Sequence, residues 1–173
     1  ILIDTVSDSG LRALRSRLAI PVVGPGEAAF AAAMMLGKKF TVLTMWPEWF
    51  PLYEKTLTEY GWWERVASLR SIETRPDVTE LLAGKEEVIF DKLREEALLA
   101  IEEDGADVIV LGSTTMHQSA KYLDDVLPIP VINPGQVAYK FLETLLELGL
   151  THSKKAFPAP EVPKDADIRK GWY

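Results

Sequence analysis

The sequence IPVVGPGEAAF at residues 20–30 returns as IPVINPGQVAY at residues 129–139. Ile, Pro, Val, Pro, Gly and Ala recur at equivalent positions, and Phe30 corresponds to Tyr139. Each copy is a short apolar run followed by a Pro-Gly turn and an amphipathic segment, which is typical of a strand that leads into a helix. The repeat therefore predicts two related structural units in this chain.

A second pair of segments matches upstream of the two copies. ILIDTVSDSG at residues 1–10 resembles VIVLGSTTMH at residues 108–117, each an apolar strand followed by a hydroxyl-rich turn. With a single-residue gap Thr5 corresponds to Ser113, and without the gap it corresponds to Thr114. Buried parallel strands use few residue types, so a short match can arise by chance. Two blocks in the same order argue for a true duplication.

Short β-branched runs alternate along the chain with longer amphipathic segments, which predicts a parallel α/β sheet. Strands are predicted near residues 1–5, 20–23, 40–45, 67–72, 107–112 and 129–132. Helices are predicted near residues 10–18, 27–36, 50–60, 86–103, 116–126 and 135–148.

The duplication also predicts the domain organisation. The second copy follows two strand–helix units over residues 40–104, whereas nothing precedes the first copy. We therefore expect residues 1–38 to be the remainder of a first lobe that lacks roughly 60–70 leading residues. We expect residues 39–134 to form a second lobe and helix 135–150 to return to the first lobe. Residues 151–173, rich in proline and charge, are expected to form an extended C-terminal tail.

Composition excludes several classes of function. The chain has no cysteine, which rules out disulfides and thiol catalysis. A net charge of −7 disfavours a nucleic acid partner. The longest apolar run, at residues 28–36, has about half the roughly 18 residues that a membrane span needs. No spacing of His, Asp and Glu suggests a metal site. We expect a cytoplasmic protein with no membrane partner; the start at Ile1 looks internal, so a signal peptide would not be visible here.

Both hydroxyl-rich turns follow parallel strands, whose carboxyl ends form the ligand-binding edge of such sheets. Free N–H groups at helix N-termini make such turns suited to a small anionic substrate. The predicted substrate contacts are Ser7, Ser9, Thr114 and Thr115 in the turns, with Thr44, Asn133 and Gly135 at further strand ends. The same hydroxyls could instead cap helices, and Gly135 could simply permit a tight turn.

Two side chains are candidate bases. His117 is the one histidine near the second turn, although a histidine in the first turn of a helix is more often exposed. Asp8 could take a proton or could be solvated or capping. Trp46 and Trp49 follow the strand at residues 40–45 and are candidate substrate contacts. The aromatic residues around them are also typical of a core or of a homo-oligomer interface.

Five segments in collinear order resemble the hydantoin racemase branch of the aspartate/glutamate racemase superfamily. They are PVVGPGEAAF (21–30), KKFTVLT (38–44), EEDGADVIVLGSTTM (102–116), IPVINPG (129–135) and LGLTHSK (148–154). The resemblance implies an α/β fold of two flavodoxin-like parallel-sheet lobes related by a pseudo-twofold axis, with the first lobe truncated at its N-terminus in this chain. It also implies that no cofactor is needed.

The same resemblance identifies the main departure from the family pattern. The family uses one cysteine from each lobe, one thiolate removing the Cα proton and the other thiol returning a proton from the far side. Thr5 and Ser113 occupy the matching positions here. An alcohol is a far weaker acid than a thiol and cannot copy this mechanism unaided, but it can donate a hydrogen bond to a carboxylate or enolate-like oxygen.

We therefore expect an isomerase-like enzyme that acts on the Cα proton of a small carboxylate, amino acid or hydantoin-like substrate. Ser113, Thr5, His117 and Asp8 are the candidate catalytic residues. Two alternatives stay open: a non-catalytic protein that binds a small anion, and a decarboxylase or tautomerase with a single base on the same fold.

Overall fold

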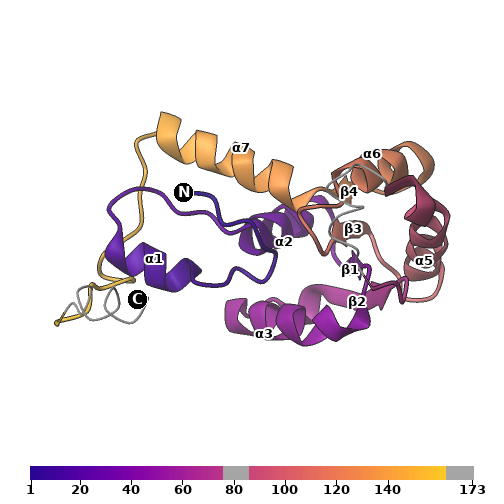
Figure 1. Cartoon of the computed structure of the whole chain (residues 1–173), viewed down its shortest axis with the longest axis horizontal. Helices are drawn as coiled ribbons and strands as arrows, with labels where there is room; N and C mark the ends of the chain where they lie inside the picture. The colour runs from indigo at the N-terminus through magenta and orange to yellow at the C-terminus, as the bar shows by residue number, and fades with distance from the viewer. Residues whose placement is uncertain (76–85, 163–173) are drawn as a thin grey trace, which may run out of the picture.

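The computed structural model describes residues 1–75 and 86–162. A parallel sheet of order β2-β1-β3-β4 lies toward one end of an elongated molecule (Figure 1). Its strands are β1 (Phe40–Thr44), β2 (Val66–Ser71), β3 (Val108–Leu111) and β4 (Val131–Ile132). Every pairing in this sheet is parallel, which confirms the predicted α/β class.

Helices follow the strands as predicted, within about two residues for most of them. They are α1 (Leu11–Arg17), α2 (Pro25–Leu36), α3 (Phe50–Tyr60), α5 (Phe90–Glu102), α6 (His117–Val126) and α7 (Pro134–Glu147). Short 3₁₀ turns cover Pro47–Trp49, Trp63–Arg65 and Glu86–Ile89, so the segment predicted as one helix over 86–103 begins with such a turn. In the described part of the chain, no helix is long and apolar enough to span a bilayer.

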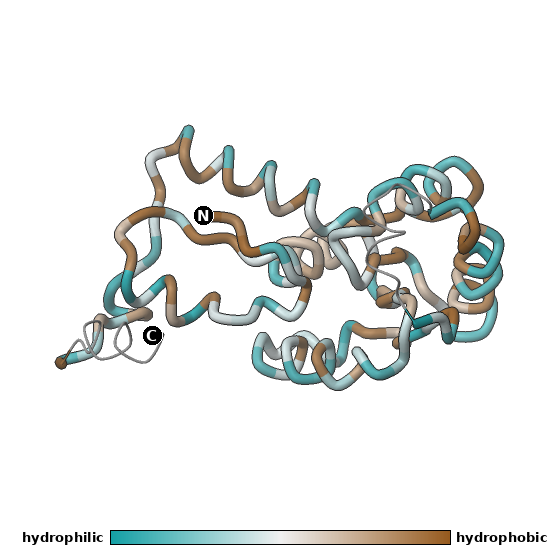
Figure 2. Tube along the Cα trace, viewed as in Figure 1, coloured by the Kyte–Doolittle hydropathy of each residue, from teal (hydrophilic) through white to brown (hydrophobic). Residues whose placement is uncertain are grey.

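The central strands β1 and β3 are buried, because both faces of the sheet are covered. One apolar core packs α5 and α6 on one face and includes Leu43, Leu93 and Ile109. The other packs α2 and α3 on the opposite face and includes Phe30 and Val42. Figure 2 shows polar and apolar residues alternating along these covering helices, as expected for helices that bury one side only.

The predicted strands at residues 1–5 and 20–23 are reduced to one isolated parallel bridge between Leu2 and Val23. The Ile3 N–H donates to the Val23 carbonyl at 3.0 Å, and the Val23 N–H donates to the Ile1 carbonyl at 3.0 Å. Within the described residues these two segments have only each other as strand partners. Two strands alone form a marginal sheet, which explains why the regular ladder expected here is missing.

This bridge fixes the register of the duplication. Val23 and Ile132 are equivalent positions of the repeat, and they pair with Leu2 and Val110 respectively. Leu2 is therefore equivalent to Val110, and three residues further along Thr5 is equivalent to Ser113. The alignment with the single-residue gap is the one that the backbone adopts. The helices of the two copies, α2 and α7, pack against each other, with Ala28 and Ala138 buried between them.

Beyond the sheet, α7 runs back over the N-terminal segment, and the chain then descends beside α1 (Figure 1). The described part of the expected tail is not simply extended, because residues 154–156 form a turn. The Lys154 ammonium donates to the carbonyl oxygens of Arg15 at 2.8 Å and Leu18 at 2.5 Å. The last carbonyls of a helix lack intrahelical partners, and Lys154 donates hydrogen bonds to such carbonyls at the end of α1. Residues 163–173 of the expected tail lie outside the described residues.

His152 joins this C-terminal segment to the strand before α2. Its Nε2 atom accepts a hydrogen bond from the Val22 N–H at 2.7 Å, which requires the neutral imidazole. Burial lowers the pKa of His152 below its usual 6.5, and the nearby Arg15 guanidinium lowers this pKa further. The folded state therefore disfavours the protonated form of His152.

This contact predicts a pH dependence of stability. Because the unfolded chain binds the His152 proton more readily than the folded chain, the contribution to stability is full above about pH 6.5 and is lost as the pH falls. We expect the free energy of unfolding to fall between about pH 7 and pH 5, and to fall less in His152→Gln, whose amide oxygen accepts the same bond without titrating. Urea denaturation at both pH values measures the free energy of unfolding. If this free energy fell equally in the two proteins between pH 7 and pH 5, the assignment to His152 would be wrong.

Candidate functional site

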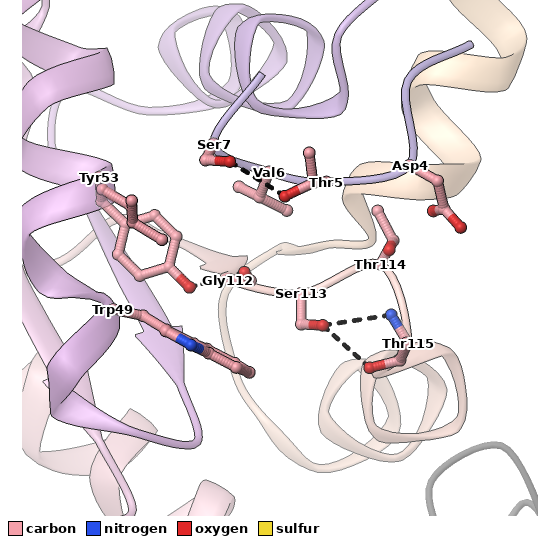
Figure 3. A pocket seen from close by; sticks show the side chains of 11 residues that line it. Asp4, Thr5, Val6, Ser7, Trp49, Tyr53, Gly112, Ser113, Thr114 and Thr115 are labelled. Atoms are coloured by element: carbon pink, nitrogen blue, oxygen red, sulfur yellow. Dashed lines mark hydrogen bonds between the residues drawn. The ribbon is translucent and has the colours of Figure 1, made fainter. Parts of the chain in front are cut away.

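A cavity of about 260 Å³ lies between the two hydroxyl-rich turns, as Figure 3 shows. We call residues 4–9 the first turn and residues 112–115 the second turn. The cavity is lined by Asp4, Thr5, Val6 and Ser7 of the first turn, by Gly112, Ser113, Thr114 and Thr115 of the second, and by Trp49, Leu52 and Tyr53. Thus the structure brings together Thr5 and Ser113, the equivalent positions of the duplication, with Ser7, Thr114 and Thr115.

Each turn carries hydroxyls joined in a row. Thr5 Oγ1 lies 3.0 Å from Ser7 Oγ, and in the second turn Ser113 Oγ lies 2.9 Å from Thr115 Oγ1. These two pairs occupy equivalent positions of the duplication. Ser7 also bonds Ser9 at 2.9 Å, but Ser9 is exposed and outside the cavity. Because each such bond uses one hydroxyl hydrogen, each row keeps one hydrogen, and the first row presents it to the cavity from Thr5 when Ser9 donates to Ser7 and Ser7 donates to Thr5.

The backbone before Ser113 is held by a buried polar cluster. The Tyr53 hydroxyl donates to the Gly112 carbonyl at 2.7 Å and lies 3.0 Å from Thr44 Oγ1. A Cβ atom on residue 112 would lie 2.6 Å from the Tyr53 oxygen, so glycine is required for this approach. Burial raises the pKa of Tyr53 to about 12, which keeps the phenol protonated and donating. Thr44, a predicted substrate contact, is fully buried in this cluster and does not line the cavity.

Asp8 is a candidate base that the structure places outside the cavity, at the N-terminus of α2. Its carboxylate accepts the N–H groups of Gly26 at 2.9 Å and Glu27 at 2.7 Å, and the Tyr60 hydroxyl at 2.8 Å. Burial raises the pKa of Asp8 above its usual 3.8, and the hydrogen bonds from Tyr60 and the two N–H groups partly offset this rise. The geometry is that of a helix cap.

His117, the other candidate base, begins α6 and does not line the cavity. Its side chain is 62% exposed, and its Nδ1 atom lies 3.3 Å from Glu86 Oε1. Glu86 is fully buried and accepts the N–H groups of Gln118 and Ser119 and the Ser119 hydroxyl. Here too the carboxylate caps a helix, and the histidine lies beside this cap.

The remaining predicted contacts lie at the start of α7. The Asn133 side chain accepts the Gln136 N–H at 3.3 Å and so caps this helix. Gly135 lies next to Thr114, because a Cβ atom on Gly135 would lie 3.8 Å from the Thr114 Cβ. Neither Asn133 nor Gly135 lines the cavity. The described residues contain no group of three or more His, Asp or Glu that could hold a metal ion.

Known proteins share this architecture. Residues 1–142 match the model of the Asp/Glu/Hydantoin racemase family. The chain belongs to this family. It is 36% identical to a hydantoin racemase of Pseudomonas sp. (strain NS671) over 155 residues, covering 89% of this chain and 61% of that protein. Among the curated relatives that it matches, including a hydantoin racemase of Rhizobium meliloti, this chain spans about three fifths of their length.

Solved structures agree with the family assignment. An allantoin racemase from Klebsiella pneumoniae superposes with a TM-score of 0.82 at 35% identity, covering 94% of this chain and 65% of that chain. The allantoin racemase AllR of Pseudomonas fluorescens gives 0.85 at 32% identity, covering 94% and 68%. This racemase-family chain therefore shares both fold and sequence with racemases.

Sequence reasoning missed part of this racemase-family cavity. Asp4, Leu52 and Tyr53 line the cavity but are not among the predicted contacts. A signal was present, because Tyr53 follows Trp49 by four residues and so shares its helical face. Trp49 lines the cavity as predicted, whereas Trp46 lies outside it and packs edge-on against Trp49. Association of these aromatic residues into a homo-oligomer interface stays a prediction.

Proposed function

We propose that the cavity binds a hydantoin-like ring and that the protein is an isomerase-like enzyme acting on the Cα proton of that ring. One observation carries the proposal: Thr5 and Ser113, the equivalent positions of the two turns, line one cavity. A planar ligand between the two turns would meet a hydroxyl row on each side. The family and the names of the racemases similar to this chain support the same class of reaction.

The lining favours a neutral cyclic amide over the small anion that we expected. None of the described residues that line the cavity has a cationic side chain, and Asp4 contributes a carboxylate. A bound carboxylate would lose hydration without gaining a counter-charge. A neutral ring needs only hydrogen bonds from the hydroxyls and apolar contact, which Trp49 and Leu52 provide.

The hydroxyls suit stabilisation of charge better than removal of a proton. When the Cα proton leaves, negative charge develops on a carbonyl oxygen of the ring, and Ser113 and Thr5 can donate hydrogen bonds to it. Neither alcohol is acidic enough to serve as the base, and the high pKa of Tyr53 keeps that phenol from doing so. The proton then passes to water or hydroxide in the open cavity, and this proposed chemistry requires no cofactor.

The test is exchange of the Cα proton in deuterated water. We expect the protein to catalyse deuterium incorporation into an enantiopure 5-substituted hydantoin, measured by NMR, at a modest rate. Ser113→Ala should lower the rate by roughly 10²-fold, as loss of one such donor does elsewhere. His117→Ala should leave the rate unchanged, because His117 lies outside the cavity. Exchange that depends on His117 and not on Ser113 would contradict this mechanism.

A second candidate function is binding without catalysis. The observation that favours it is the position of both candidate bases, since neither Asp8 nor His117 lines the cavity. The same position disfavours a decarboxylase or tautomerase that relies on either of these residues as its single base. Hydantoin binding in a titration together with no exchange above buffer would identify a binding protein, whereas exchange above buffer would support the enzyme.

A further inference from the structure

The two turns differ in the residue directly before the equivalent hydroxyls. Asp4 precedes Thr5, whereas Gly112 precedes Ser113. Among the described residues that line the cavity, Asp4 is the one with a charged side chain. It is exposed, and within the described residues its carboxylate has no hydrogen-bonding or ionic partner. Its charge is therefore available to a ligand.

The opposite wall of the cavity is apolar. Trp49, Leu52 and Tyr53 come from the start of α3 and the turn before it, and the first turn contributes no aromatic residue to the lining. Figure 3 shows Trp49 and Tyr53 on one side of Ser113 and Asp4 on the other. The cavity thus has an aromatic side and an acidic side, although its two hydroxyl rows are alike.

This asymmetry would orient a bound ring. The hydroxyl rows offer the same hydrogen bonds to both faces of a planar ligand and cannot distinguish its two ends. The substituent at C5 of the ring can extend toward either side: an alkyl group gains apolar contact with Trp49 and Leu52, whereas a cationic terminal group gains more on the side of Asp4. A cation there gains a counter-charge, whereas an anion is repelled.

We propose that Asp4 is a specificity-determining residue that selects hydantoin-like rings bearing a cationic substituent, such as an alkylammonium group. The inference rests on the proposed function, because it requires that the ring binds in this cavity. Asp4 is solvent-exposed, so its effect is modest: an exposed charge pair typically changes affinity by about 1.5- to 5-fold. Attraction of a cation and repulsion of an anion together give an expected affinity ratio of about 2- to 25-fold.

The test compares three ligands that share a four-carbon side chain and carry a cationic group, no charged group or an anionic group at its end. They are 5-(4-aminobutyl)hydantoin, 5-butylhydantoin and 5-(4-carboxybutyl)hydantoin, titrated calorimetrically into the protein. We expect affinity to decrease in this order. Asp4→Asn should bring the affinities for the cationic and anionic ligands close together. About 0.5 M NaCl should have a similar effect on the wild type, because salt screens exposed charges.

A matched control separates a local effect from the net charge of −7. Asp124→Asn removes the same charge from an exposed position near the end of α6, outside the cavity, and should leave the wild-type ratio intact. Equal affinities for the three ligands in the wild type, or an equal change of the ratio in both variants, would overturn the role of Asp4. Failure of all three hydantoins to bind would instead overturn the proposed function itself.

Discussion

Replacing Thr5 and Ser113 together with cysteine is expected to raise the rate of Cα deuterium exchange on a hydantoin by about 10²- to 10⁴-fold. A thiol can lose its proton near neutral pH and an alcohol cannot, so the double variant would gain a base on one side of the ring and an acid on the other. The two residues occupy equivalent positions and line one cavity, which is the arrangement that such a pair requires. NMR in deuterated water measures exchange, and polarimetry measures racemisation.

Single variants and a misplaced thiol make this experiment decisive. Thr5→Cys or Ser113→Cys alone supplies one thiol, so each should exchange a proton from one face with little racemisation. Ser9→Cys places a thiol on the first turn but outside the cavity and should add nothing. A double variant that binds the hydantoin and still exchanges at the wild-type rate would show that more than the acid–base pair has been lost.

Asp8→Ala is expected to lower the free energy of unfolding by about 2–4 kcal/mol. The substitution removes the cap of α2 and leaves the Gly26 and Glu27 N–H groups without their acceptor. It also places alanine at a φ of 51°, in the left-handed region that aspartate and asparagine tolerate better. Urea denaturation at neutral pH measures the loss.

Asp8→Asn is the matched control for the cap. The amide keeps an acceptor oxygen and the tolerance for positive φ, so it should lose less stability than the alanine variant. Under conditions in which both Asp8 variants are folded, both should still bind the hydantoin. If Asp8→Ala left stability unchanged and abolished exchange, Asp8 would act on the substrate and the capping assignment would be wrong.

The sequence alone determined the order of elements and the pairing of the two turns. Strands and helices have distinct hydrophobic periodicities, and these can be read from local sequence. Local signals such as the prolines that begin α2 and α7 mark helix starts whatever the tertiary context. The duplicated sequence left Thr5 opposite either Ser113 or Thr114, and the bridge between Leu2 and Val23 decided for Ser113. The strands at residues 1–5 and 20–23 were overestimated, because a ladder depends on neighbours that a local pattern does not contain.

Only the tertiary structure decided which polar side chains face the ligand. Thr44 and Asp8 carry suitable groups next to the correct strands. However, the Thr44 hydroxyl is hydrogen-bonded to Tyr53, and the Asp8 carboxylate accepts N–H groups at the N-terminus of α2. Sequence could not reveal this, because both contacts depend on how α3 and α2 pack against the neighbouring segments. A buried polar group forms its hydrogen bonds with the partners that this packing brings near it. Asp4 is the opposite case. Within the described residues its carboxylate has no partner, so its charge lies exposed at the cavity.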